Sequence, residues 1–282
     1  MIAPPARLAR RFVAGKEAAD AIAAGRRLHQ RGIKATFDLL GEDVLDREAA
    51  RRSAKANEDL LRRIPPEVER NISIKLTMMG LDISTDFCLE LTAGILDVAR
   101  QVGGFVRIDM EGSKHTQRTI DAFRSLRRRY DNVGIVLQAY LRRTEDDVKE
   151  AVARGDRVRI CKGAYKEPPE LAWTKMDDIR ASYRRCARLL LEKGNYPAIA
   201  THDESLVQDA LSFARERGIG SERYEFQMLY GLRPRRWGEL VRSGHNMRVY
   251  VPFGTHWFPY FYRRLRERKE NVFFVIRSLF GG

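Results

Sequence analysis

The stretch VGIVLQAYLRRTEDDVKEAVARGDRVRICKGA, residues 133–164, contains two short apolar runs joined by a polar segment. The runs VGIVLQA (133–139) and VRICKGA (158–164) contain β-branched residues, which favour strands. Between them, Thr144 is followed by three acidic residues. Acidic side chains stabilise the first turn of a helix because the helix dipole is positive at that end. The stretch therefore predicts a strand, a helix and a second, parallel strand.

The same pattern recurs along the whole chain. The other apolar runs are KATFDLL (34–40), NISIKL (71–76), FVRIDM (105–110), PAIATH (197–202), YEFQML (224–229) and MRVYVP (247–252). Successive runs begin 23 to 39 residues apart, which is enough for a strand, a helix and two loops. Eight such units predict the α/β class and a (β/α)8 TIM barrel rather than an open doubly wound sheet. We expect residues 1–282 to form a single domain with a short N-terminal helical extension.

The segments between the runs have the features of helices. Residues 46–64 are rich in Ala, Arg, Glu and Leu and are followed by Pro65 and Pro66, which stop a helix. Residues 84–98 begin with Ser and Thr and have helical apolar periodicity. The longest predicted helix covers residues 172–193. No low-complexity linker separates these elements.

Composition places the chain among globular proteins. Hydrophobic residues make up 44% and aromatic residues 9%, which excludes a disordered basic tail. The 52 Lys and Arg residues exceed the 38 Asp and Glu residues, so the formal net charge is +14. A basic protein is a candidate for nucleic-acid binding, but the sequence has no RNA-recognition, helix-turn-helix or zinc-finger pattern. We therefore predict no nucleic-acid partner.

The three cysteines, Cys88, Cys161 and Cys186, lie far apart, so the sequence predicts neither a disulfide framework nor a zinc site. A reducing, cytoplasmic location is the default expectation. No secretory signal of the usual design and no run of about 18 apolar residues is present. The segment NVFFVIRSLF (271–280) is open to two interpretations: a terminal helix packed on the core, or an amphipathic patch for a membrane surface.

Polar residues gather at the carboxyl ends of the predicted strands. In a TIM barrel these ends meet at one mouth, which is where active sites lie. Ionisable or amide side chains occur at seven of the eight ends, more than loops alone would explain. They are Lys75, Asp109, Glu111, Gln138, Arg159, Lys162, Thr201, His202, Asp203, Gln227 and Tyr250.

Two cationic groups indicate anion recognition. Arg159 and Lys162 lie beside Gly163 and Ala164, where small residues let a ligand approach the backbone while the cations meet a phosphate or an electron-rich ring. Neither GxGxxG nor a P-loop is present, so any nucleotide must be held by the barrel mouth.

The second cationic group lies in YFYRRLRERKEN, residues 260–271. On a helix, Tyr260, Arg263, Arg264 and Glu267 share one broad face, and paired arginines suit forked recognition of a carboxylate. A solvated arginine face is the alternative interpretation of this segment.

Serine-nucleophile and metal chemistry have little support. The sequence has no GxSxG and no HExxH, and the five histidines lack ligand spacing, so we predict no metal. His202, at a predicted strand end, is the one histidine with the position of a site residue. We expect His115 and His245 to be ordinary surface residues.

Eight motifs in order resemble the proline dehydrogenase family, and more narrowly its bacterial monofunctional form, from about residue 12 to residue 271. They are SIKL (73–76), RIDME (107–111), VLQAY (136–140), RICKGAYKEP (159–168), ATHD (200–203), EFQMLYG (225–231), RVYVPFGT (248–255) and YFYRRLRE (260–267). The resemblance implies a distorted barrel with FAD at its mouth. It also implies oxidation of L-proline to Δ1-pyrroline-5-carboxylate by hydride transfer to flavin N5, the first step of proline catabolism to glutamate.

The resemblance further implies roles for individual residues. It implies catalytic roles for Asp109, Arg159 and Tyr165. It implies substrate binding by Lys75, Tyr250, Tyr260, Arg263 and Arg264. It implies FAD binding by Met110, Gln138, Arg159, Lys162, Gly163, Ala164, Tyr165, Thr201, His202 and Gln227. Asp203 departs from the Asn that is common in the family, which adds negative charge near the flavin site.

The partners implied by the resemblance are L-proline, a membrane quinone that accepts the electrons and a separate pyrroline-5-carboxylate dehydrogenase. Contact with a quinone would place a cytoplasmic protein at the inner face of the membrane as a peripheral protein. The enzyme alternative is another flavin barrel, similar to methylenetetrahydrofolate reductase, which an NAD(P)H oxidation assay would separate from proline oxidation. That alternative does not account for the paired arginines beside Tyr260.

Overall fold

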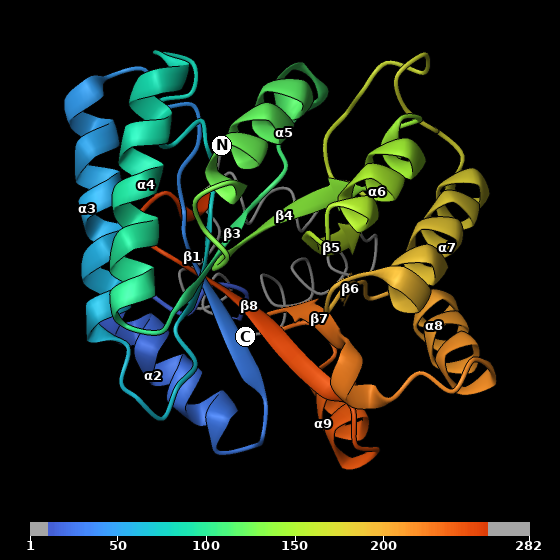
Figure 1. The fold of residues 1–282 in the computed structure, drawn as a ribbon. Helices are drawn as coiled ribbons and strands as arrows, with labels where there is room; N and C mark the ends of the chain where they lie inside the picture. Colours follow the sequence, from blue (N-terminus) through green and yellow to red (C-terminus); the bar gives the residue numbers. More distant parts are fainter. Residues whose placement is uncertain (1–10, 259–282) are drawn as a thin grey trace, which may run out of the picture.

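The computed structural model describes residues 11–258, and within them eight strands form a closed parallel barrel (Figure 1). The strands are β1 (Lys34–Leu39), β2 (Asn71–Ile74), β3 (Phe105–Ile108), β4 (Val133–Gln138), β5 (Arg157–Cys161), β6 (Ala198–Ala200), β7 (Glu225–Leu229) and β8 (Asn246–Phe253). Each strand pairs with the next in the chain, and β8 pairs with β1. The predicted (β/α)8 barrel is confirmed.

Helices surround the strands and connect them (Figure 1). The helices are α2 (Ala18–His29), α3 (Arg47–Arg63), α4 (Thr85–Gln101), α5 (Ser113–Arg127), α6 (Thr144–Ala153), α7 (Met176–Lys193), α8 (Glu204–Glu216) and α9 (Pro234–Arg242), with a 3-10 turn at Ser221–Arg223. The helix starts follow the sequence signals. The side chain of Asp46 accepts from the N–H of Ala49 at 2.7 Å, so it caps α3.

The predicted N-terminal helix, α2, is part of the barrel wall. It precedes β1 and packs against β1 and β8. In a regular barrel a helix that follows β8 covers this position. The approach is close: a Cβ atom on Gly25 of α2 would lie 2.5 Å from the ring of Phe37 on β1. The glycine therefore allows α2 to seat on the barrel.

One helix boundary differs from the prediction. Helix α7 begins at Met176, although the sequence pattern predicted its start at residue 172. The preceding residues are not helical: the carbonyl of Leu171 and the N–H of Trp173 pair with the backbone on either side of Leu141, at 2.9 and 2.7 Å. These tertiary hydrogen bonds replace the first helical turn.

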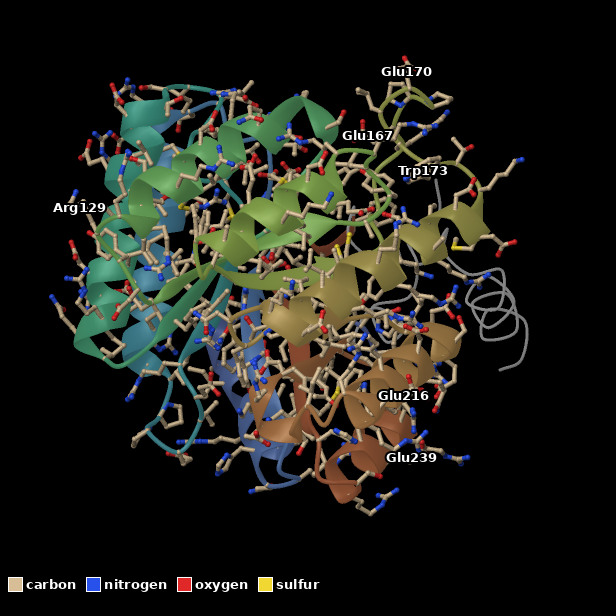
Figure 2. The ribbon with its side chains drawn as sticks, turned by 45° about the vertical axis from the view of Figure 1, so that its right-hand side comes forward. Arg129, Glu167, Glu170, Trp173, Glu216 and Glu239 are labelled. Carbon is tan, nitrogen blue, oxygen red and sulfur yellow. The ribbon has the colours of Figure 1, made fainter. Side chains whose placement is uncertain are left out.

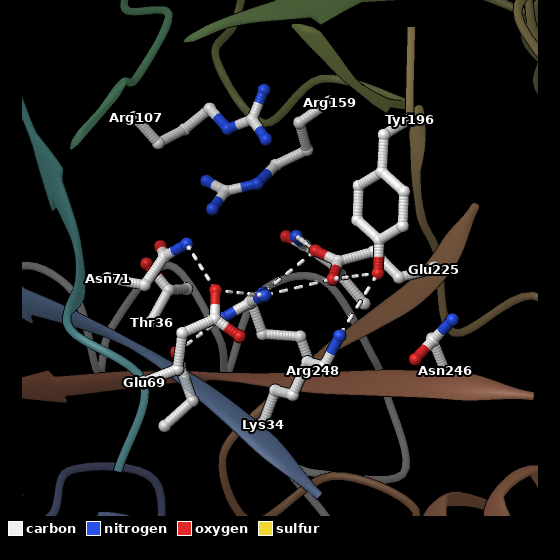
Figure 3. A network of polar contacts seen from close by, with 12 residues as sticks. Lys34, Thr36, Glu69, Asn71, Arg107, Arg159, Tyr196, Glu225, Asn246 and Arg248 are labelled. Atoms are coloured by element: carbon white, nitrogen blue, oxygen red, sulfur yellow. Dashed lines mark hydrogen bonds and ion pairs between the residues drawn. The ribbon is translucent and has the colours of Figure 1, made fainter. Parts of the chain in front are cut away.

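The strands separate an apolar outer face from a polar interior. On β2, Ile72 and Ile74 are buried in the core between strands and helices, whereas Ser73, between them, hydrogen-bonds to Arg159 across the barrel. TIM-barrel interiors are usually filled by branched apolar residues. Here the inward positions carry carboxylates, guanidinium groups and amides, so the interior itself is a polar network (Figure 3).

The centre of that network is a buried ion pair between β7 and β8. Arg248 donates to both carboxylate oxygens of Glu225, at 2.8 and 3.0 Å, and to Glu69 at 2.8 Å. The Tyr196 hydroxyl donates to Glu225 at 3.3 Å, and Lys34 donates to Tyr196 at 3.2 Å (Figure 3). Burial opposes the ionisation of Glu225. The charge and hydrogen bonds of Arg248 outweigh this effect and lower the pKa of Glu225 to about 2.

The surface is covered by charges of both signs. Figure 2 shows nitrogen-tipped and oxygen-tipped side chains spread over the helices of the visible face. Many of them pair, as Arg188 does with Asp209 at 2.6 Å. Within residues 11–258, no helix is long and apolar enough to cross a membrane.

Candidate active site

A cavity of about 870 Å³ opens at the carboxyl ends of the strands. The residues within 11–258 to which the resemblance gives a role all line it: Lys75, Asp109, Met110, Gln138, Arg159, Lys162, Gly163, Ala164, Tyr165, Thr201, His202, Gln227 and Tyr250. The strand-end residue Glu111 does not line it, because its carboxylate is turned to Thr77. Tyr260, Arg263 and Arg264, with Glu267, lie outside the described residues. The structure therefore brings together residues that are up to 175 positions apart in the chain, from Lys75 to Tyr250.

Asp109 organises the floor of this cavity. One of its oxygens accepts from Nη1 of Arg159 at 2.7 Å, and the other accepts from the hydroxyl of Tyr250 at 2.8 Å. Nη2 of Arg159 donates to Ser73 at 3.1 Å. Burial and the nearby carboxylates raise the pKa of Tyr250 well above its ordinary value, so Tyr250 remains a proton donor. The Arg159 guanidinium is thereby fixed below the cavity.

Lys75 lies beside this group and is paired with Asp38. Its Nζ donates to the two oxygens of Asp38 at 3.0 and 3.2 Å, and both side chains are buried. Burial opposes the charge of Lys75, but Asp38 and Asp109 outweigh it and raise the pKa of the ammonium group. The sequence analysis did not identify Asp38. The signal for it was a carboxylate within the otherwise apolar run KATFDLL (34–40).

Two amide side chains present hydrogen-bonding atoms at the cavity wall. Gln138 donates through Nε2 to the carbonyl of Glu111 at 2.9 Å. The Glu111 carboxylate accepts from Thr77, at 3.1 Å from the N–H and 2.5 Å from the hydroxyl. Gln227 donates to Glu225 at 2.5 Å, and within the described chain its Oε1 is buried without a partner. A buried unpaired acceptor is costly unless a ligand or water satisfies it.

The segment after β5 approaches the cavity through Gly163. Its φ is +113°, and a Cβ atom there would lie 2.2 Å from the ring of Tyr140. Farther along, the Glu167 carboxylate accepts from the N–H of Ser113 at 2.7 Å and from its hydroxyl, at the start of α5. Tyr140 also donates to Glu167, at 3.3 Å. Glu167, near Trp173 in Figure 2, therefore caps α5 and anchors the segment that carries Tyr165.

We expect Gly163→Ala to destabilise the protein by about 2–3 kcal/mol, because the substitution combines an unfavourable φ with a clash against Tyr140. Gly155→Ala is the matched control: its φ is +69° but no atom lies within 4 Å of the added Cβ. Urea unfolding of both variants separates the two effects. If both variants lost the same free energy of unfolding, the contact between the added Cβ atom and Tyr140 would not contribute to the destabilisation.

Asp203 lies between two cations on the cavity wall. It accepts from Lys162 at 3.2 Å and from Arg180 at 2.9 Å, and its other oxygen caps α8 through Ser205 at 3.2 Å. Burial opposes the charge of Asp203, but the bonds from Arg180 and Ser205 and the charge of Lys162 outweigh it and lower its pKa. Asp203 therefore holds the two cations in place, and sequence reasoning did not find Arg180.

The histidines differ in role from each other. His202 lines the cavity, and its Nε2 accepts from the N–H of Leu229 at 2.9 Å, so the neutral ring carries its proton on Nδ1. The expectation of a surface position is wrong for His115, which is 3% exposed. His115 lies on the buried face of α5, and Asp82 pairs with its Nε2 at 2.9 Å, which satisfies the buried ring. His245 is half-buried against Tyr224 rather than fully exposed.

These features define a (β/α)8 barrel whose mouth is lined by cations that carboxylates hold in place. The sequence profile described as "Proline dehydrogenase" matches residues 21–277. Proline dehydrogenase 2 of Bacillus subtilis (strain 168) is 38% identical over 95% of this chain and 89% of its own length. Proline dehydrogenase of Deinococcus radiodurans is 35% identical over 98% of this chain and 91% of its own length.

Solved structures agree with these relatives. Proline utilization A (PutA) from Bdellovibrio bacteriovorus, inactivated by N-propargylglycine, superimposes with a TM-score of 0.84 at 27% identity. The match covers 92% of this chain and 32% of that chain, so the present sequence spans about a third of the larger protein. The chain belongs to the proline dehydrogenase family and is an enzyme of that family. The resemblance predicted from the motifs is confirmed.

Proposed function

We propose that this chain, as a single barrel domain, oxidises L-proline to Δ1-pyrroline-5-carboxylate with bound FAD and passes the electrons to a quinone. The observation that carries the proposal is the grouping of Lys75, Asp109, Arg159 and Tyr250 at one barrel mouth in a member of this family. A fixed ammonium group suits a substrate carboxylate, and a fixed guanidinium suits an electron-rich ring.

The residues at the mouth fit a flavin. The cavity of about 870 Å³ is within the range of cofactor sites. Gln227 and Arg159 line it, and within the described chain Oε1 of Gln227 and Nε of Arg159 are buried without a partner. Gly163 leaves the backbone after β5 open to close approach. Flavin supplies the acceptor for a hydride from the carbon beside the proline nitrogen.

Further residues would complete the cofactor site. Lys162, Ala164, Thr201 and His202 lie along the cavity wall and would contact the ribityl and pyrophosphate parts, with Met110 and Gln138 beside the ring. Lys162 is held by Asp203, so its charge has a fixed position before any ligand binds.

The substrate would be held on the opposite side by charge and by aromatic rings. Lys75, together with Arg263 and Arg264, would bind the carboxylate, which sets the distance between the reacting carbon and the cofactor. Tyr165, Tyr250 and Tyr260 would surround the ring. Both oxygens of Asp109 already accept hydrogen bonds, so Asp109 orients Arg159 and Tyr250 rather than taking up the substrate proton.

Arg159 would supply the electrostatic part of catalysis. Hydride transfer makes the acceptor ring electron-rich, and a preorganised positive charge stabilises that change without reorganisation. Arg159 is 5% exposed and fixed by Asp109 and Ser73, which meets the requirement for preorganisation.

The proposed partners follow from the reaction. A membrane quinone would receive the electrons at the inner face of the membrane, and the net charge of +14 favours contact with an anionic surface. A separate pyrroline-5-carboxylate dehydrogenase would consume the product. The test is a steady-state assay of FAD-loaded protein with L-proline and a soluble quinone. We expect quinone reduction that depends on proline and no consumption of NAD(P)H; the reverse result would contradict the proposal.

Lys75→Met is expected to raise the KM for proline by about 10- to 100-fold with flavin still bound, because a charge-assisted bond to the carboxylate is lost. Lys162→Met is the matched control: it removes a cavity cation that follows β5 rather than β2, and should weaken flavin binding more than it changes the KM. Steady-state kinetics and flavin retention on gel filtration measure both effects. An unchanged KM in Lys75→Met would contradict the carboxylate assignment.

A further inference from the structure

Arg107 is a buried cation that the proposed chemistry does not use. Seven charged side chains are buried on the barrel strands or at the first residue after them. Three pairs account for six of them: Lys75 with Asp38, Arg159 with Asp109, and Arg248 with Glu225. The seventh is Arg107, which is 2% exposed and has no carboxylate partner among the described residues.

The hydrogen-bond acceptors of Arg107 are neutral backbone carbonyls. Its Nη1 donates to the carbonyl of Arg157 at 2.7 Å and to that of Ile135 at 3.4 Å, and its guanidinium lies 5.0 Å from the ring centroid of Phe105. Figure 3 shows Arg107 and Arg159 close together above the Glu225 and Arg248 pair, with no polar contact drawn between the two arginines. Burial, followed by the charges of Arg159 and Arg157, lowers the pKa of Arg107, and the more distant charge of Glu225 only partly offsets these effects.

The neighbouring strand makes room for this cation. Gly134 of β4 is the register partner of Arg107, and a Cβ atom on Gly134 would lie 2.5 Å from Nη1 of Arg107. Arginine remains protonated in proteins, so the barrel carries a permanent, unpaired charge. Such a charge is costly to bury, and replacing it by a neutral residue should not weaken the fold. Because burying this charge costs free energy, we look for a role of Arg107 other than stabilising the fold.

The position of Arg107 indicates that role. Arg107 lies on β3, two residues before Asp109, and is therefore about 7 Å farther from the barrel mouth than Asp109 is. Its charge repels the Arg159 guanidinium and so favours the orientation in which Arg159 meets Asp109. The same charge makes the cavity above it more positive, and the low dielectric of the interior preserves this effect over such distances.

We propose that Arg107 is a positioning residue that keeps Arg159 at the barrel mouth and, through its unpaired charge, favours the reduced, electron-rich state of the bound flavin. This inference rests on the proposed flavin chemistry.

The test compares Arg107→Gln, which removes the charge but keeps a donor for the Arg157 carbonyl, with Arg107→Lys, which keeps the charge. FAD-loaded proteins are reduced at equilibrium beside a reference dye. We expect the equilibrium constant for flavin reduction to fall about tenfold in Arg107→Gln, equivalent to about 30 mV for a two-electron couple, and to change less than threefold in Arg107→Lys.

Arg107→Met, which has no donor, is the second neutral variant and should give the same shift with no loss of thermal stability. An unchanged potential in either neutral variant would overturn the inference while leaving proline oxidation intact. Failure of both neutral variants to fold would show that the barrel itself needs Arg107, and would also overturn it. Absence of bound flavin from the unmodified protein would contradict the proposed function and this inference together.

Discussion

Arg248→Met is expected to lower the free energy of unfolding by about 3–5 kcal/mol, measured by urea or guanidinium denaturation. The substitution leaves Glu225 buried without its bidentate partner, and an unpaired buried charge is among the most destabilising changes in a core. Lys149→Met is the matched control, because Lys149 forms an exposed ion pair with Asp146 at 2.9 Å. Exposed pairs contribute less than about 1 kcal/mol.

The same variant has a distinct pH dependence. In the native protein the pKa of Glu225 is lowered from 4.5 to about 2, so its stabilising contribution is present above pH 4.5 and is lost as the pH falls toward 2. Without Arg248, this loss between pH 4.5 and 2 should disappear. A variant as stable as the native protein at pH 7, with the same acid dependence, would show that the pair does not hold the barrel together.

Asp109→Asn is expected to reduce kcat/KM for proline by about a hundredfold or more. Asp109 is the shared acceptor of Arg159 and Tyr250, so its replacement releases the guanidinium and the hydroxyl from their positions together. Misplacement of a catalytic group by about 1 Å costs roughly a hundredfold in rate. Anaerobic stopped-flow measurement of flavin reduction by proline reports this step directly.

Tyr250→Phe serves as the comparison for Asp109→Asn. It removes one of the two hydrogen bonds of Asp109 and leaves the bond to Arg159. We expect a smaller loss of rate, with the flavin retained in both variants. If Tyr250→Phe were as damaging as Asp109→Asn, the organising role would belong to the hydroxyl rather than to the carboxylate.

The fold could be predicted from the sequence because each strand and helix of the barrel has local sequence features that mark it. The Ile72 and Ile74 alternation marks β2, and Asp46 and Pro65 mark the ends of α3. The start of α7 was harder to predict, because the residues before Met176 have helical composition but are held out of the helix by hydrogen bonds to a segment some 30 positions earlier. Local propensity does not contain that information.

The candidate site was predicted in part for a similar reason. Polar residues at strand ends were visible because all parallel strands point to one mouth. Asp38 and Arg107 lie inside apolar runs, and their roles depend on the groups of other strands that contact them, Lys75 for Asp38 and the Arg157 carbonyl for Arg107. The need for Gly134 is likewise visible only once Arg107 is placed against it.

An anaerobic titration of the FAD-loaded protein with L-proline, followed at the flavin absorbance bands, tests cofactor, substrate and reaction together. We expect stepwise bleaching of the oxidised flavin spectrum as proline is added, and recovery of the spectrum when a quinone follows. A protein that remains colourless after incubation with FAD, or a bound flavin spectrum that proline leaves unchanged, would contradict the assignment of FAD-dependent proline oxidation to this barrel.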